Sequence, residues 1–377
     1  MTQRCHVCQS RELIPFEDFS RFLQVTSDCR PHPHTGCLAG CARCGTVQKV
    51  ADEAYLRECA GIYEAYELYK LSGGLEQQIF SQNSGAAESR SMRLLKALDR
   101  LGRLPEQGRL LDVGCGNGGL LRSFNAVRPG WAMWGCELHD RNRAVVEAIP
   151  GVEGFHVGDV AGLDRTFDMI SLLHSLEHIV APLEFLAGLK AKLRPGGLLL
   201  IDVPDFLAGP FDLLVADHVT HFTLDGLERL VRAAGFDVLF SSDTAVNKEL
   251  TLLARSAECP ATSLESAPCP VDRVEHALAW LGAVLGAAMD GAARGEFGLF
   301  GTAIAAVWLR TELNEAVAFF VDEDRSKTGK SLFGVPVITP DQVERGEVLL
   351  PFPPAMARQI AERLAGLGIR FILPPDL

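Results

Sequence analysis

A glycine-rich turn between an apolar strand and an apolar helix is the part of the sequence whose residue types most clearly predict a binding site. Residues 110–119 read LLDVGCGNGG. Glycine adopts the backbone angles of a sharp turn and lets the main chain approach a ligand closely where the helix starts. We therefore expect the turn residues to hold a nucleotide-bearing cofactor; they are Asp112, Gly114, Gly116, Asn117 and Gly118.

Polar side chains follow this turn at the ends of the next strands. Glu137 ends the second strand, 137 − 118 = 19 residues after Gly118, where a carboxylate can accept both hydroxyls of a ribose. Asp159 ends a third strand and can accept from an adenine amino group. His174 ends a fourth strand, 167–174, and we count it with these residues in the cofactor site.

Two cofactors fit the glycine pattern. Residues 114–119 satisfy G-x-G-x-x-G, the dinucleotide fingerprint. Residues 112–118 satisfy D-x-G-x-G-x-G, and with the spacing of the strands they resemble the class I S-adenosylmethionine (SAM) methyltransferases. Asp112 favours SAM, because a carboxylate facing the turn repels a pyrophosphate and suits a cationic ligand that carries an amino acid. A turn with a purely structural role would need Glu137 and Asp159 at strand ends by accident.

Two Cys-x-x-Cys pairs near the N-terminus predict a metal site. Cys5 and Cys8 form the first pair, and Cys41 and Cys44 form the second. Four thiolates make a closed tetrahedral zinc site, and a short segment with few apolar residues needs such a site to fold. Two alternatives stay open. One is four unrelated buried cysteines, and the other is an iron–sulfur cluster on Cys37, Cys41 and Cys44, which have the C-x3-C-x2-C spacing of radical-SAM enzymes.

Length and composition limit the class of protein. A chain of 377 residues with 47% hydrophobic and 22% charged residues is typical of a globular protein of two or three domains. The net charge of −12 argues against a nucleic-acid partner, because phosphates need a basic surface. The longest uncharged apolar run, 277–289, is shorter than the about 20 residues of a membrane span. We expect a cytoplasmic protein that acts on a small molecule, with no membrane partner; the sequence sets no oligomeric state.

Alternating strands and helices must position these residues. The fold class we predict is α/β, with a class I SAM-methyltransferase Rossmann-like domain at 91–257. A zinc-binding module at 1–60 and a connecting helix at 61–90 precede it, and a small Rossmann-like α/β domain at 271–377 follows. Tyrosines at 63, 66 and 69 share one helical face of the connecting segment. They form either a packed stripe or, at Tyr66, a phenol that reaches over the cofactor site.

The three parts in this order resemble the bacterial nucleotide-sugar C-methyltransferases, which methylate a carbon next to a keto group on a deoxysugar. In that family, histidines in two segments after the SAM motifs line the sugar site. The first segment matches residues 174–179, HSLEHI, and the second, typically Y-x-E-H-x-x-[YH]-F, matches residues 215–222. The resemblance implies His218 as the base, oriented by Asp217, with His178 or a tyrosine holding the keto oxygen.

Two departures from the family pattern leave the reaction open. Val215 stands where the family usually has tyrosine, and Asp217 where it usually has glutamate. An oxygen or nitrogen nucleophile needs only one positioned base, so O- or N-methylation of a sugar or another small molecule is the alternative. A non-catalytic SAM-binding scaffold is a third hypothesis, and the intact set of Asp112, Glu137 and Asp159 weighs against it.

Overall fold

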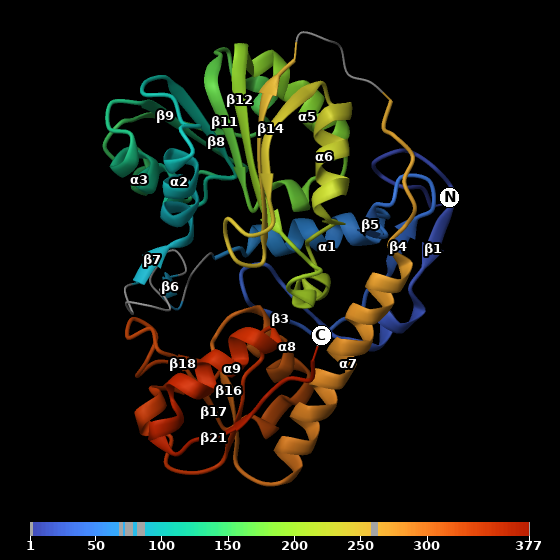
Figure 1. Ribbon diagram of the computed structural model, residues 1–377, viewed down its shortest axis with the longest axis vertical. Helices are drawn as coiled ribbons and strands as arrows, with labels where there is room; N and C mark the ends of the chain where they lie inside the picture. Colours follow the sequence, from blue (N-terminus) through green and yellow to red (C-terminus); the bar gives the residue numbers. More distant parts are fainter. Residues whose placement is uncertain (1–2, 68–70, 72–77, 81–86, 258–262, 377) are drawn as a thin grey trace.

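A seven-stranded sheet forms the upper part of the computed structural model, which describes residues 3–67, 71, 78–80, 87–257 and 263–376 (Figure 1). In spatial order its strands are β10 (Val152–Val157), β9 (Ala132–Glu137), β8 (Arg109–Val113), β11 (Phe167–Leu173), β12 (Leu193–Pro204), β15 (Glu249–Ser256) and β14 (Phe236–Ser242). The first five strands are parallel, and β15 runs antiparallel to both of its neighbours. This order, with one reversed strand beside the edge, is the class I SAM-dependent methyltransferase fold, so the predicted fold class is confirmed.

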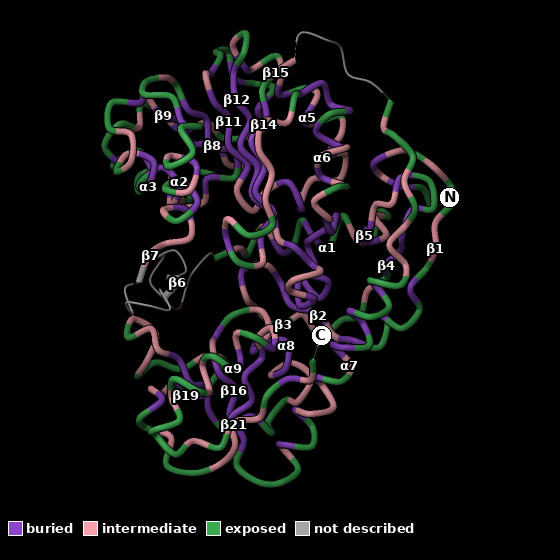
Figure 2. The backbone as a smooth tube through the Cα atoms, in the orientation of Figure 1, coloured by how far each residue is buried: buried purple, intermediate pink, exposed green. Residues whose placement is uncertain are grey.

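Helices cover both faces of this sheet, and the buried strands between them form the core (Figure 2). On one face lie α2 (Arg90–Arg100) and α3 (Gly119–Val127), and on the other α5 (Pro182–Leu189) and α6 (Leu224–Ala233); α4 (Arg143–Glu147) is short. Serine and threonine side chains start two of these helices. Ser89 accepts from the main chain of Met92 at α2, and Thr223 from that of Gly226 at α6. Such caps satisfy amide groups that a helix start leaves without a partner.

The N-terminal module shares a sheet with the methyltransferase domain. Its strands β1 (Leu13–Pro15), β4 (Leu38–Cys41) and β5 (Val47–Lys49) are followed in spatial order by β13 (Thr220–His221). Thr220 pairs with Gln48, and His221 pairs with Val47. A smaller hairpin joins β2 (Gln24–Val25) and β3 (Pro31–His32). The N-terminal module therefore supports a histidine segment that lies more than 170 residues further along the chain.

The segment that connects the module to the large sheet differs from the prediction. Helix α1 (Glu53–Glu64) begins where Asp52 accepts from the main chain of Tyr55, and it ends before Tyr66. A short hairpin, β6 (Gln78–Phe80) with β7 (Ala87–Ser89), leads into α2. The predicted connecting helix at 61–90 is therefore wrong, because the helical residues lie earlier. Tyr69 lies outside the described residues.

The C-terminal domain is a second α/β unit. Its sheet has the order β18 (Ser331–Leu332), β19 (Val335–Ile338), β17 (Phe319–Val321), β16 (Phe297–Phe300), β20 (Glu347–Leu349) and β21 (Arg370–Ile372), and all pairs but the first are parallel. Its helices are α7 (Val271–Ala293), α8 (Ile304–Leu313) and α9 (Pro354–Arg363). Trp280 of α7 packs edge-on against Phe211, which joins this domain to the methyltransferase domain. Within the described part of the chain, every helix is too short or too polar to cross a membrane.

Candidate active site

The glycine turn between β8 and α3 has the close-packed geometry that the sequence predicted. Gly114, Gly116 and Gly118 all have positive φ angles, of 74°, 53° and 82°. A Cβ atom on Gly114 would lie 2.7 Å from Cβ of Ser175, and one on Gly118 would lie 2.4 Å from the Ile149 side chain. Neither position has room for a larger residue, so these glycines let the main chain pack closely at the start of α3.

The predicted carboxylates lie at the same edge of the sheet. Glu137 accepts from the main chain of Gly116 at 2.6 Å, and burial raises its pKa. Asp159 is exposed and accepts from the main chain of Ala161 at 2.8 Å. Asp112 is buried within β8 and accepts from the hydroxyl of Ser171 on β11 at 2.8 Å. Glu137 and Asp159 are thus placed where they can face a nucleoside. The Asp112 side chain connects β8 to β11 by a hydrogen bond.

One member of the turn makes a different contact. The side-chain oxygen of Asn117 accepts from Arg122 at 3.1 Å, one helical turn further along the chain. This bond fixes the amide at the rim of the turn.

His174 belongs to a buried ionic cluster beside the turn. Its Nε2 lies 3.2 Å from Oε1 of Glu249, its Nδ1 lies 3.4 Å from Oε1 of Glu177, and Arg90 contacts both the ring and Glu249. Burial and Arg90 lower the pKa of His174, but Glu249 and Glu177 outweigh them and raise it to about 9. Arg90 and Glu249 were missed by sequence reasoning.

A second buried cluster brings the predicted catalytic histidines together. The Nδ1 atoms of His218 and His221 lie 2.6 Å from the two carboxylate oxygens of Asp212, a residue of the short 3-10 turn Pro210–Leu214. Burial favours the neutral acid, but both imidazoles hold the pKa of Asp212 well below its usual range. The partner of His218 is therefore Asp212 and not the adjacent Asp217, which corrects the prediction.

Asp217 instead lies beside His178. Its carboxylate accepts from the main chain and the hydroxyl of Ser27, at 2.8 and 2.5 Å. Nδ1 of His178 lies 2.9 Å from the Asp217 carbonyl and 3.1 Å from the hydroxyl of Tyr63. The hydroxyl of Tyr66 lies 3.5 Å from Oγ of Ser27. Tyr63, and not the predicted Tyr66, is the phenol that touches the histidine cluster.

Two side chains of the N-terminal module contact the segment that carries His218 and His221. Lys49 is 1% exposed, and its Nζ donates to the Leu213 carbonyl at 2.5 Å. Burial lowers the pKa of Lys49 to about 7, although Asp212 and Asp217 oppose the change. Nε2 of His6 lies 2.7 Å from Oγ1 of Thr220. Sequence reasoning missed Lys49 and Asp212, because only the folded chain brings them to the histidines.

The four predicted metal ligands form one cluster. Sγ atoms of Cys5 and Cys44 are 3.6 Å apart, those of Cys8 and Cys41 are 3.5 Å apart, and all four are free cysteines within 4.8 Å of one another. Tetrahedral zinc at about 2.3 Å from each sulfur needs sulfurs about 3.8 Å apart, so these residues fit the ion. Cys37 is exposed and is not in this group.

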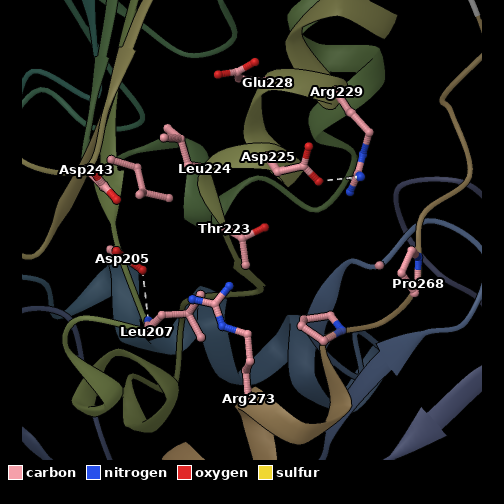
Figure 3. A pocket seen from close by; sticks show the side chains of 13 residues that line it. Asp205, Leu207, Thr223, Leu224, Asp225, Glu228, Arg229, Asp243, Pro268 and Arg273 are labelled. Atoms are coloured by element: carbon pink, nitrogen blue, oxygen red, sulfur yellow. Dashed lines mark hydrogen bonds and ion pairs between the residues drawn. The ribbon is translucent and has the colours of Figure 1, made fainter. Parts of the chain in front are cut away.

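A polar cavity of about 430 Å³ opens between α6, the end of β14 and the start of α7 (Figure 3). Four carboxylates and two guanidinium groups line it: Asp205, Asp225, Glu228, Asp243, Arg229 and Arg273. Asp225 and Arg229 pair with each other at 2.6 Å, and Leu207 donates to Asp205 at 2.9 Å. None of its lining residues belongs to the histidine cluster or to the glycine turn.

The strand order, with the glycine turn after β8, defines a class I SAM-dependent methyltransferase domain. Residues 86–240 match a family model described as a methyltransferase domain, a range that includes the glycine turn and the histidine cluster.

Relatives with curated names are similar to part of the chain. The ubiquinone biosynthesis O-methyltransferase of Cereibacter sphaeroides (strain ATCC 17025) is 30% identical over 156 residues, which cover 36% of this chain and 62% of that protein. The enzyme of the same name from Parvibaculum lavamentivorans is 34% identical over 103 residues, or 26% of this chain and 40% of that protein. The chain thus spans less than two thirds of each relative's length.

Solved structures are similar over about half of the chain. The [4+2]-cyclase SpnF has 18% identity and a TM-score of 0.40, covering 50% of this chain and 90% of that one. Human N-acetylserotonin methyltransferase in complex with SAM has 20% identity and a TM-score of 0.38, covering 45% of this chain and 52% of that one. The strand order itself, and not these partial likenesses, defines the fold.

Proposed function

We propose that this protein transfers a methyl group from SAM to a carbon next to a keto group on a nucleotide-linked deoxysugar. The observation that carries the proposal is the orientation of His218. Asp212 binds its Nδ1 at 2.6 Å, which leaves Nε2 as the basic atom of the neutral ring. A positioned imidazole held by a carboxylate is a general base suited to proton removal near neutral pH.

The chain's residues would divide the work between two clusters. Bound SAM supplies an electrophilic methyl group, and the Gly114–Gly118 turn, Glu137 and Asp159 would hold its nucleoside. His218 would remove the proton next to the acceptor's carbonyl, and the electron pair that remains would attack the methyl carbon. The hydroxyl of Tyr63, which lies 3.1 Å from Nδ1 of His178, would donate to the keto oxygen as its negative charge develops.

The cysteine cluster would hold a structural zinc ion. Its ligand Cys41 ends β4, and β4 pairs with β5, which in turn pairs with β13 and its His221. Zinc would therefore stabilise the strand that sets the position of His221, while taking no part in methyl transfer.

A second candidate reaction is O-methylation of a small-molecule hydroxyl. The similarity to ubiquinone biosynthesis O-methyltransferases, which is 30% identity over 156 residues for one of them, favours it. An oxygen nucleophile needs only one base, and the pair of His218 and Asp212 would serve that chemistry equally well.

A mass-spectrometric screen tests the proposal. Purified protein is incubated with SAM and a panel of nucleotide-linked 4-ketosugars, with the matching 4-hydroxysugars and catechols as controls. We expect a gain of one methyl group on a ketosugar, at a carbon. Methylation of only hydroxysugars or catechols would replace the first candidate with the second.

A further inference from the structure

Three side chains of the histidine cluster converge on one point. A carboxylate oxygen of Glu177 and a ring nitrogen from each of His178 and His218 all lie within 4.8 Å of one another. The two imidazole rings are nearly perpendicular, at 87°, with centroids 4.7 Å apart. Two histidines and one carboxylate are the protein ligands of many open transition-metal sites.

In both histidines the Nδ1 atom bonds to a neighbouring residue, which fixes the orientation of the ring. Nδ1 of His178 bonds to the Asp217 carbonyl at 2.9 Å, and Nδ1 of His218 bonds to Asp212 at 2.6 Å. Each neutral ring therefore presents its Nε2 lone pair on the other side. Metal-binding histidines have this arrangement, in which a carboxylate or carbonyl fixes the tautomer and orients the ring.

Glu177 supplies the observation that points to a ligand. The residue is 1% exposed, its Oε1 has only the His174 ring as a partner, and its Oε2 accepts no hydrogen bond from any described residue. Its nearest charged neighbour is His174, whose Nδ1 lies 3.4 Å from Oε1. A buried carboxylate with one long contact is incompletely compensated, and a bound cation would supply the missing partner.

The surrounding charge also favours a cation. Glu177, Asp212 and Asp217 are three buried carboxylates on this side of the sheet, and Lys49 is the buried ammonium group beneath two of them. His174 balances Glu177 only in part, because it also pairs with Glu249. A divalent ion bound tetrahedrally about 2.0–2.2 Å from each ligand needs the three atoms about 3.3–3.6 Å apart, which requires them to close by up to about 1.5 Å.

We infer that Glu177, His178 and His218 form a second metal site, separate from the cysteine cluster, for a divalent transition-metal ion of the Zn²⁺ or Co²⁺ type. The ion and a proton would compete for the same Nε2 atom of His218. Occupation of this site would therefore block methyl transfer, a consequence that rests on the proposed role of His218 as the base. Binding itself does not depend on that role.

Titration of zinc-loaded protein with Co²⁺ tests the site directly. We expect one added Co²⁺ per chain, with the weak visible absorption of nitrogen and oxygen ligands and none of the strong absorption of thiolates. Glu177→Gln should weaken Co²⁺ binding at least about tenfold, and Asp212→Asn about 10- to 100-fold, because it frees the ring that His218 must present. His276→Asn, which changes an exposed histidine on α7, is the matched control and should bind Co²⁺ like the wild type.

Zinc content and thermal unfolding show whether each variant is folded. X-ray absorption at the cobalt edge of the wild type needs no variant, and it should show imidazole ligands and no sulfur. Absence of an added Co²⁺, a sulfur shell, or equal affinity in a folded Glu177→Gln protein would overturn the metal site.

Activity separates this inference from the proposed function. With an acceptor found in the screen, Co²⁺ should stop methyl transfer at the concentrations at which it binds, and a brief exposure to EDTA should restore it. Binding without inhibition would keep the metal site and contradict His218 as the base. Inhibition without binding to the folded wild type would overturn the site and leave the base assignment standing.

Discussion

Replacing Asp212 by asparagine removes the negative charge that two imidazoles share. Both of its carboxylate oxygens accept from a histidine at 2.6 Å, one from His218 and one from His221. An amide can accept from only one of them, and its N–H groups would turn the other ring to the tautomer with its proton on Nε2. Charge-assisted hydrogen bonds contribute about 1.5–3 kcal/mol each.

The expected loss of methyl-transfer rate follows from these bonds. Losing the charge beside His218 costs about 1.5–3 kcal/mol, or about 10- to 100-fold at 1.36 kcal/mol per tenfold. The wrong tautomer of His218 would extend the loss to about 10⁴-fold, the upper range for a positioned base. SAM affinity should be unchanged, because Asp212 lies outside the glycine turn.

Asp217→Asn is the matched control for this change. Asp217 accepts from Ser27, lies 3.5 Å from Nδ1 of His178 and does not bond to the His218 ring, so its loss should cost about 1 kcal/mol, a factor of about five. Single-turnover rates, SAM affinity by calorimetry and melting temperature are measured for both variants. A folded Asp212→Asn protein within about threefold of wild type, or a larger loss in Asp217→Asn, would refute the assignment of Asp212 as the orienting carboxylate.

Three further changes test other parts of the account. Glu137→Ala should weaken SAM binding while the N-terminal module stays folded; unchanged affinity in calorimetry would contradict the placement of the ribose. Elemental analysis should find one zinc per chain in protein purified without added metal, lost with the N-terminal fold when Cys5 and Cys8 become serine, whereas iron and sulfide would revive the cluster of radical-SAM type. Although burial opposes it, cationic neighbours lower the pKa of Glu249, so its charge stabilises the fold above the usual glutamate value of about 4.3 and this contribution fades as the pH falls further. Glu249→Gln should therefore lower the melting temperature at pH 7, and the difference from wild type should shrink toward pH 3.

The sequence predicts the parts of this fold that depend on local pattern. The strand–turn–helix at 109–127 follows from an apolar run, closely spaced glycines and a second apolar run, and β9, β11 and β12 follow from similar runs. The paired Cys-x-x-Cys motifs predicted the four-cysteine cluster, because the two cysteines of each pair are already close in sequence.

Contacts between distant segments are the part that sequence patterns miss. Lys49 and Leu213 are 164 positions apart, and His6 and Thr220 are 214 apart, so no spacing rule joins them. Asp212 was overlooked because Asp217 is adjacent to His218 in the sequence and was therefore the obvious partner. In the structure the Asp217 side chain bonds to Ser27 instead, and His218 bonds to Asp212. The prediction of a helix at 61–90 was wrong for another reason. The three-residue spacing of the tyrosines continues beyond Glu64, where α1 ends.

Exchange of the acceptor's alpha proton with deuterated solvent tests the central claim most directly. The acceptor from the screen is incubated with protein and S-adenosylhomocysteine in D₂O, so that a carbanion can form but no methyl group is available. We predict deuterium at the carbon that SAM later methylates, and a loss of about 10²- to 10⁴-fold in this exchange for a folded His218→Ala variant that still binds SAM. Methylation at an oxygen or nitrogen without exchange, or full exchange in the His218→Ala protein, would contradict the account.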